Sequence, residues 1–212
     1  MRNEKVMYEK SIKRIIDIIL SLTGIVILLP LILVITILIK LKLGSPVFFT
    51  QERIGYRGKR FKLIKFRTMS NEKNSEGKLL KDKDRTNKFG EILRASSLDE
   101  IPELMNVLKG EMSIVGPRPL LTDYEEYYTK EQFRRHDILP GITGWAQING
   151  RTSITWSKTF KLDTWYVDNV NFLLDIKILF MTILKVVQKS DTENKRDKAV
   201  KYFNDGETNT NE

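Results

Sequence analysis

The chain of 212 residues is long enough for one folded core with attached segments, and its 41% hydrophobic and 30% charged residues suit a folded protein. It contains no cysteine and one histidine, His136. The lack of cysteine excludes disulfides, thiol catalysis, iron–sulfur clusters and thiolate zinc sites. His136 stands between Arg135 and Asp137, and this polar setting predicts a solvated turn rather than a catalytic histidine.

The net charge of +9 is concentrated in the N-terminal third of the chain. Up to Arg67 there are 14 Lys and Arg against 4 Asp and Glu, and the remaining residues hold 22 against 23. A basic block of this kind predicts an anionic partner, which is a membrane surface, a phosphate compound or a nucleic acid.

An uncharged apolar segment of 22 residues runs from Ile18 to Ile39. As a straight helix it would be about 33 Å long, which is enough to cross the hydrocarbon core of a bilayer. The segment is too long for a signal peptide and lacks a small-residue cleavage site. It is apolar on all faces, which argues against a helix in a soluble core.

Two features favour a re-entrant helix over a simple span. Pro30 lies near the centre of the apolar segment and removes a backbone hydrogen bond there. Basic residues flank both ends, so the positive-inside rule draws both ends to the cytoplasm; they are Lys5, Lys10, Lys13 and Arg14 before the segment and Lys40 and Lys42 after it. We therefore expect a helix that bends at Pro30 and leaves on the side it entered, with a span as the alternative.

Asp17 stands at the entrance of the apolar segment, one helical turn after Lys13. Residues at this spacing can form an ion pair. We expect a local salt bridge between the two residues.

Beyond the apolar segment the patterns predict a small hairpin followed mainly by helices. Strands are expected over 47–50 and 61–69, joined through a turn at 55–58, and an exposed polar loop over 71–87. Helices are expected over 89–95, 97–108, 122–133 and 156–170, with loops over 115–119 and 140–151. The apolar helix expected over 172–189 suits either the core or the membrane interface, and the charged segment after it is expected to be disordered.

The string from Ser97 to Glu103 carries two adjacent carboxylates, Asp99 and Glu100. Ser97 and Glu100 have the spacing of a capping box, and Asp99 would meet the positive end of the helix dipole. Taken alone, the residues favour capping. The second interpretation is chemical, since a helix start attracts phosphate and two carboxylates beside a diphosphate invite Mg²⁺.

Cations suited to phosphate stand in two further segments. In the basic stretch from Arg53 to Arg67, strand alternation turns some charges toward the core, so Lys65 and Arg67 are predicted to be specific ligands rather than part of a nucleic-acid patch. Arg118 is flanked by Pro117 and Pro119, which stiffen the backbone around it. The chain has no Walker A motif and no dinucleotide-binding glycine fingerprint.

Together these segments resemble the bacterial sugar transferase family, the monotopic phosphoglycosyl transferases that begin glycan assembly on a lipid carrier. The matching strings are KRIIDIILS, FFTQERIGYRGKRFKLIKFRTM, LRASSLDEIPELMNVLKGEMSIVGPRPLL and LPGITGWAQINGR, in that order along the chain. Each string is a weak motif, but the ordered set is specific. One departure is the pair Leu29-Pro30, because Ser-Pro is familiar at this position in the family.

The resemblance implies an α+β fold that is mostly helical. It implies a re-entrant N-terminal membrane helix, a small β-hairpin and a compact catalytic core with interfacial amphipathic helices. The expected parts are a membrane segment over 1–43, a catalytic domain over 44–189 and a disordered tail over 190–212. The protein is then expected at the inner, cytoplasmic membrane of a bacterial cell, with its catalytic domain on the cytoplasmic face.

The resemblance also implies a two-step reaction. The residue that matches the family's nucleophile is Asp99, which would attack the β-phosphate of a UDP-sugar and release UMP; undecaprenyl phosphate would then take the phosphosugar from it. Glu100 matches the partner carboxylate, and the two acids together are expected to hold Mg²⁺. Arg94 and Arg118 match arginines near the phosphates and the uridine, and Lys65 and Arg67 match basic residues of the same cleft.

Two other functions stay open on the sequence. A membrane-attached basic adaptor that binds nucleic acid or acidic lipid would explain the charge asymmetry but not the paired acids or the Gly-Pro-Arg-Pro loop. A one-step glycosyltransferase would release UDP rather than UMP. For the favoured reaction no nucleic-acid partner is expected. The sugar, the glycan pathway and the oligomeric state, a dimer included, are left open.

Overall fold

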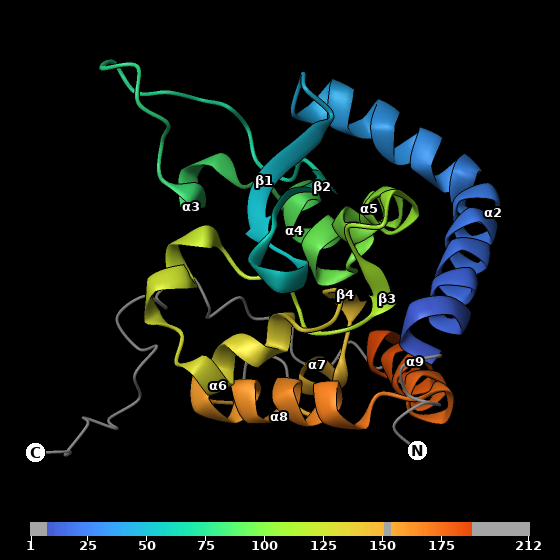
Figure 1. Cartoon of the computed structure of the whole chain (residues 1–212). Helices are drawn as coiled ribbons and strands as arrows, with labels where there is room; N and C mark the ends of the chain where they lie inside the picture. Colours follow the sequence, from blue (N-terminus) through green and yellow to red (C-terminus); the bar gives the residue numbers. More distant parts are fainter. Residues whose placement is uncertain (1–7, 151–153, 188–212) are drawn as a thin grey trace, which may run out of the picture.

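A single long helix, α2 (Lys13–Lys42), curves around one side of the molecule, and the other elements pack inside the curve (Figure 1). The computed structural model describes residues 8–150 and 154–187. The helix follows a short π-helical turn, η1 (Tyr8–Ile12), and continues through Pro30. Proline is a usual cause of bending in a helix that does not break. Among the described residues, α2 is the one helix long and apolar enough to cross a membrane, so the predicted long apolar helix is confirmed.

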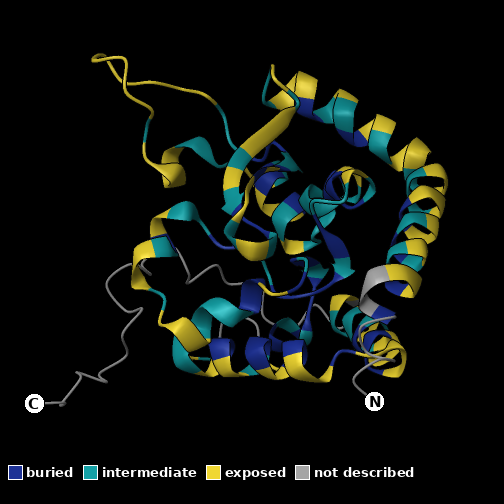
Figure 2. Cartoon of the chain, viewed as in Figure 1, coloured by how far each residue is buried: buried dark blue, intermediate teal, exposed yellow. Residues whose placement is uncertain are grey.

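The two ends of α2 are anchored in the rest of the molecule, whereas its middle is not. Near its start Lys13, Asp17 and Ser21 are buried, and near its end Ile35 and Ile39 are buried. Between these ends the helix presents apolar side chains outward, with Val26 and Ile27 each 70% exposed. Figure 2 shows this outer face as a continuous exposed and half-buried surface.

The predicted hairpin is present and longer than the pattern indicated. Strand β1 (Phe48–Ile54) pairs antiparallel with β2 (Arg60–Phe66), and Phe48 lies opposite Phe66. A 3₁₀ turn, η2 (Tyr56–Gly58), joins them. Because side chains alternate along β2, Phe61 and Leu63 point to the same face and are buried. They pack with Val107 and Met112.

A second, parallel strand pair was not predicted: one strand lies inside the loop expected over 140–151, and the other ends at the first residue of the loop expected over 115–119. The pair joins β3 (Ser113–Val115) to β4 (Gly141–Thr143). The two segments approach closely because both carry glycine: a side chain at position 141 would begin 2.0 Å from the backbone nitrogen of Gly116. Glycine and proline are typical of loops, but here the glycines permit the close backbone contact that lets β3 and β4 pair.

Helices make up most of the remaining described chain, which confirms a mostly helical α+β fold. In chain order they are α3 (Asp82–Arg85), α4 (Lys88–Ala95), η3 (Leu98–Glu100), α5 (Glu103–Lys109), η4 (Thr122–Tyr127), α6 (Lys130–Phe133), η5 (Arg134–His136), α7 (Trp145–Ile148), α8 (Trp156–Asn169) and α9 (Phe172–Val187). The helices expected over 89–95 and 156–170 are confirmed as α4 and α8. The tail predicted from residue 190 onward lies outside the described residues.

Two predicted helices are each divided in two. The helix expected over 97–108 is split into η3 and α5 around Pro102, which lacks an N–H to continue the hydrogen-bond ladder. The helix expected over 122–133 is split at Tyr128, which is extended. Thr129 then caps α6 and forms a capping box with Gln132, so a new helix begins here instead of the continuous helix that was expected.

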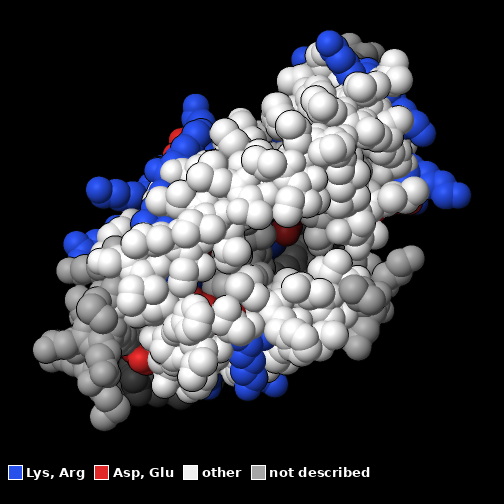
Figure 3. Space-filling model, turned by 90° about the vertical axis from the view of Figure 1, so that its right-hand side faces the viewer, with Lys and Arg blue, Asp and Glu red and all other residues white. Residues whose placement is uncertain are grey.

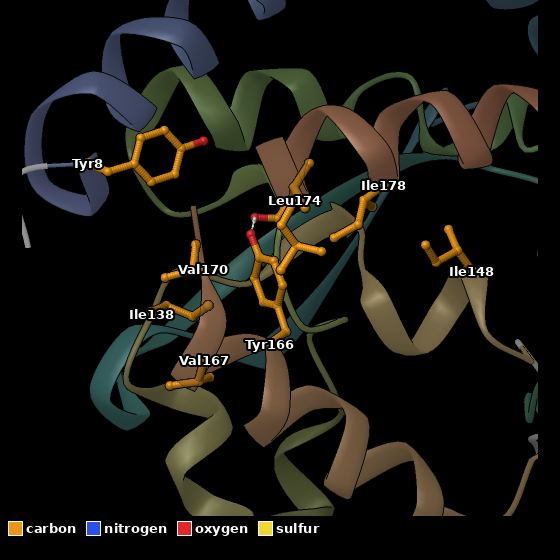
Figure 4. Close-up of a cluster of buried hydrophobic side chains, with 9 residues drawn as sticks. Tyr8, Ile138, Ile148, Tyr166, Val167, Val170, Leu174 and Ile178 are labelled. Carbon is orange, nitrogen blue, oxygen red and sulfur yellow. Dashed lines mark hydrogen bonds between the residues drawn. The ribbon is translucent and has the colours of Figure 1, made fainter. Parts of the chain in front are cut away.

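The base of the molecule is formed by α8 and α9, which pack over the buried cluster drawn in Figure 4. The Tyr166 hydroxyl donates a hydrogen bond of 2.5 Å to Asp175 and lies 3.4 Å from the Val115 carbonyl oxygen. Asp175 also accepts a hydrogen bond of 2.6 Å from Tyr8 and forms a buried ion pair with Lys13. This carboxylate therefore joins the start of α2 to α8 and α9.

Two expectations for polar residues are wrong. His136 is buried, not solvated: it is 3% exposed, and burial lowers its pKa to about 3, so the imidazole is neutral. Asp17 does not form the expected salt bridge with Lys13, because that ammonium pairs with Asp175. The Asp17 carboxylate instead accepts a hydrogen bond of 3.0 Å from the backbone N–H of Ile114.

Replacing Asp175 with alanine should destabilise the protein by about 3–5 kcal/mol, because it leaves the buried Lys13 ammonium without its counter-ion. The measurement is thermal unfolding of the detergent-solubilised protein. The matched control is Glu76→Ala, which breaks the exposed pair with Lys78 and should change stability by no more than about 0.5 kcal/mol. Equal unfolding midpoints for the two variants would contradict the anchoring role of Asp175.

Candidate active site

The two adjacent acids lie on η3, a short turn between α4 and α5. Ser97 precedes the turn with a φ of 57°, in the left-handed region that costs energy for a residue with a side chain. Its side chain makes no capping hydrogen bond, so the capping-box interpretation of Ser97 and Glu100 is wrong. The left-handed turn, not a cap, redirects the chain after α4.

Apolar side chains next to the two acids pack this turn on α2. Leu98 and Ile101 flank the two acids and pack on the cluster that contains Ile35 and Ile39 of α2. Both side chains are partly buried, so each contributes less than the roughly 1.5–3 kcal/mol of a fully buried side chain of this size. The position of Asp99 and Glu100 is therefore set by the second half of α2.

Glu100 is the centre of an ion-pair network. One of its carboxylate oxygens, Oε1, accepts hydrogen bonds from Lys65 Nζ of β2 and from Arg118 Nη2 of the loop after β3, each at 2.7 Å. Lys65 Nζ also lies 3.2 Å from Oε1 of Glu103, the first residue of α5. Three segments that are far apart in the sequence thus meet at one carboxylate.

The network gives the three acids different protonation behaviour. Burial alone would raise the pKa of Glu100, but Arg118 and Lys65 outweigh it and hold the pKa at about 2. For Glu103, burial and the nearby Glu100 charge raise the pKa to about 7. Neighbouring titratable groups with pKa values pushed apart are a mark of acid, base or nucleophile assignments.

Asp99 lies between these extremes. Burial raises its pKa to about 6, Lys65 opposes the rise, and the Glu100 charge adds to it. At neutral pH Asp99 is therefore mainly a carboxylate, yet a more basic one than an exposed aspartate. A partly buried carboxylate that keeps its charge and is surrounded by cations can act as a nucleophile.

The other predicted site residues are divided between this network and a structural position. Arg94 of α4 lies close enough to lower the pKa of Asp99 and donates a 2.8 Å hydrogen bond to Thr68. Arg67 is buried and points elsewhere: its guanidinium donates to the backbone carbonyls of Leu43 and Ser45, just after α2 ends. Arg67 thus fixes the segment just after α2. It is not part of the network that contains Lys65, Arg94, Asp99, Glu100 and Arg118.

Two residues of this region were not singled out from the sequence. The sequence shows Glu103 only as an acid that follows Pro102 at a helix start, and no local pattern indicates that its side chain is buried. Arg53 was one of many cations in the basic stretch. In the structure its guanidinium is close enough to Arg118 that burial and this like charge lower its pKa to about 10, so Arg53 belongs to the surroundings of the site.

The site offers Mg²⁺ a pair of carboxylates rather than a full set of protein ligands. Among the described residues no group of three or more metal-ligating side chains is present. Mg²⁺ is commonly held by one or two carboxylates together with substrate phosphates and waters rather than by a cage of protein ligands. Asp99 and Glu100 supply such a pair, and Lys65 and Arg118 occupy only one oxygen of Glu100.

Comparison with known proteins places the chain among transferases. Residues 8–189 match the family model described as bacterial sugar transferase. The chain is 59% identical over 149 residues to the uncharacterized sugar transferase EpsL of Bacillus subtilis, a match that covers 70% of this chain and 74% of EpsL. It is 37% identical to the exopolysaccharide production protein ExoY of Sinorhizobium fredii, over 81% of this chain and 83% of ExoY.

A longer relative carries a more specific name. The UDP-glucose:undecaprenyl-phosphate glucose-1-phosphate transferase of Escherichia coli is 39% identical over 186 residues. The match covers 83% of this chain but 40% of that protein. The ion-pair network lies within residues 8–189, the part that the family model matches.

The Asp99 carboxyl should titrate near pH 6, and Lys65→Met should move its midpoint to higher pH, because the Lys65 ammonium favours the ionised form. The measurement is a ¹³C NMR titration of side-chain carboxyls, with the Asp99 signal assigned by its loss in Asp99→Asn. Lys62→Met, on the exposed face of the same strand, should leave the midpoint unchanged. A midpoint near the ordinary value of aspartate would contradict the electrostatic account of the site.

Proposed function

The chain belongs to the bacterial sugar transferase family, and we propose that it transfers a phosphosugar from a UDP-sugar to undecaprenyl phosphate to begin the assembly of a surface glycan. The family and the phosphoglycosyl transferase class, which the ordered motifs predicted, are confirmed. The observation that carries the proposal is the pair of adjacent acids: Asp99 with a raised pKa beside Glu100, which two cations keep ionised.

In the first proposed step an Asp99 carboxylate oxygen attacks the β-phosphorus of the UDP-sugar. A bond forms between these atoms, and the bond from the β-phosphorus to the bridging oxygen breaks. The electron pair leaves with UMP, and a covalent aspartyl-phosphosugar results. Covalent catalysis of this kind divides one difficult transfer into two easier steps.

In the second proposed step a phosphate oxygen of undecaprenyl phosphate attacks the same phosphorus. The acyl-phosphate bond breaks, Asp99 is released as a carboxylate, and the product is undecaprenyl-diphospho-sugar. Lys65 and Arg118 lie where they can stabilise negative charge in both steps, and Arg94 adds a third cation near Asp99.

Asp99 and Glu100 would hold Mg²⁺ together with the diphosphate of the substrate. The ion would neutralise phosphate charge and act as a Lewis acid toward the phosphoryl oxygens. The protein itself supplies the other charges of the site. Glu100 orients Lys65 and Arg118, and these two cations keep the Glu100 carboxylate ionised next to Asp99.

Attachment to the membrane is also proposed through α2. Both ends of α2 pack on the same body, which is compatible with a re-entrant helix and difficult for a straight span. Figure 3 shows the side that carries α2: uncharged side chains cover most of it, and Lys and Arg lie mainly at its edges. Such an arrangement suits an apolar surface in lipid with cations at the headgroups.

Helix α9 is proposed to lie at the interface beside α2. Its inner face is buried through Leu174, Asp175 and Ile178. Its outer face is apolar and exposed at helical spacing, as expected for a helix that rests on lipid; this face consists of Leu173, Ile176, Phe180 and Ile183. The site would then face the cytoplasmic surface of the membrane, where both substrates are available.

Membrane-embedded protein should release UMP, not UDP, from one of a panel of UDP-sugars that begins with UDP-glucose, in the presence of Mg²⁺ and undecaprenyl phosphate. Asp99→Asn should lower the rate by on the order of a thousandfold or more, since the nucleophile is lost. Asp84→Asn, an exposed change on α3, should leave it unchanged. Release of UDP would point to a one-step glycosyltransferase, and binding of acidic lipid without nucleotide release would point to an adaptor.

Single cysteines at the two ends of α2 test the topology, and the natural chain has no cysteine to interfere. Ser11→Cys and Lys42→Cys should both react with a membrane-impermeant maleimide in inverted vesicles and not in spheroplasts. Asp84→Cys reports the side of the catalytic domain as a control. A chain that spans the membrane would instead expose one of the two ends in spheroplasts.

A further inference from the structure

The backbone around Arg118 is clamped by three separate donors. The carbonyl oxygens of Pro117, Arg118 and Pro119 accept hydrogen bonds, in that order, from Gly141 N at 3.0 Å, Arg135 Nη2 at 2.7 Å and Arg53 Nη1 at 3.4 Å. Both prolines are buried and carry no N–H of their own, so this segment cannot satisfy its carbonyls locally. Donors from outside the loop are needed to fix it.

The donor to Arg118 itself is an unusually buried guanidinium. The side chain of Arg135 is 1% exposed and that of its partner Asp163 is 3% exposed. Arg135 donates to Asp163 Oδ2 through Nε at 3.0 Å and through Nη2 at 2.8 Å. The carboxylate thus fixes the plane of the guanidinium, and the same Nη2 reaches the Arg118 carbonyl.

We propose that Arg135, oriented by Asp163 of α8, is a positioning residue that directs the Arg118 guanidinium toward Glu100. The chain of contacts is continuous: Asp163 holds Arg135, Arg135 holds the Arg118 backbone, and the Arg118 side chain donates to Glu100 at 2.7 Å. The inference deepens the proposed function, since Glu100 and Arg118 belong to that site. Misplacing a group by about 1 Å at a reacting centre can lower a rate by on the order of a hundredfold.

The neighbouring residue provides a matched comparison within the same two elements. Arg134, also on η5, pairs with Asp168, also on α8, but these side chains are 37% and 50% exposed. Arg134 also pairs with Glu131 of α6, which is 66% exposed, so both carboxylate partners of Arg134 lie on the surface. One Arg–Asp pair between η5 and α8 supports the site, and the adjacent one lies on the surface.

The decisive variant replaces the buried pair as a unit, Arg135→Met with Asp163→Leu, because removal of one partner alone would leave a buried charge uncompensated and could unfold the protein. The double variant should keep a thermal unfolding midpoint close to that of the wild type and lose about tenfold to a hundredfold in kcat/KM for UMP release. The control, Arg134→Met with Asp168→Leu, should retain wild-type kcat/KM.

A double-mutant cycle separates positioning from general support. In an Arg118→Ala background the Arg135 and Asp163 changes should cause little additional loss, because the side chain they direct is already absent. Arg135→Lys, which keeps a donor and a charge near Asp163, should fall between the wild type and the double variant. Full additivity in the cycle, or wild-type kcat/KM in a folded double variant, would overturn the inference.

An activity-independent readout keeps this inference distinct from the proposed function. In ¹⁵N-arginine-labelled protein, the Arg118 Nε–H signal, assigned by Arg118→Lys, should shift and lose protection from exchange in the double variant but not in the control. If wild-type protein released no UMP from any donor while this signal responded as expected, the proposed function would fail and the positioning role would stand. An unchanged signal would overturn the positioning role by itself.

Discussion

The ion pairs of Glu100 with Lys65 and Arg118 are the interaction on which the site depends. They keep one carboxylate ionised in a nearly buried position, where its charge would otherwise be too costly. The two cations come from β2 and from the loop after β3, so the hairpin register and the clamped backbone of that loop both serve the same carboxylate. The sharp turn at Ser97 then places Asp99 beside it.

The acids of the site compete with an anionic substrate for its cations. Glu100 is ionised, Asp99 is mostly ionised at neutral pH, and Glu103 with its pKa of about 7 is partly so. Lys65 and Arg118 are already engaged with these carboxylates. An anionic substrate therefore needs further positive charge, which Arg94 and Arg53 supply in part. Because the two cations that pair with Glu100 are engaged in this way, we propose Mg²⁺, a divalent ion that takes oxygen ligands from protein and phosphate together.

Much of the fold and of the site could be predicted from the sequence, because apolar periodicity and ordered motifs are local signals. The long apolar helix, the hairpin and α8 follow from such patterns. Contacts between distant segments do not follow from local patterns. The β3–β4 pair depends on the close approach of Gly116 and Gly141. His136 is buried by tertiary packing, which its polar neighbours in the sequence do not indicate. Arg67 shows the same limit. Its place in the basic stretch is visible in the sequence, but its hydrogen-bond partners, the carbonyls of Leu43 and Ser45, are not.

Helix α2, the proposed membrane anchor, is also part of the scaffold of the site. Arg14, in the first turn of α2, donates to the carbonyls of Val107 and Leu108 at 2.5 and 2.9 Å, at the end of the helix that follows the paired acids. Asp17 accepts from Ile114, two residues before the loop that carries Arg118. The far end of α2 meets Leu98 and Ile101. Because α2 contacts the residues that flank the acids and the strand that leads into the Arg118 loop, separating it from the catalytic part would remove supports on both sides of the reacting centre.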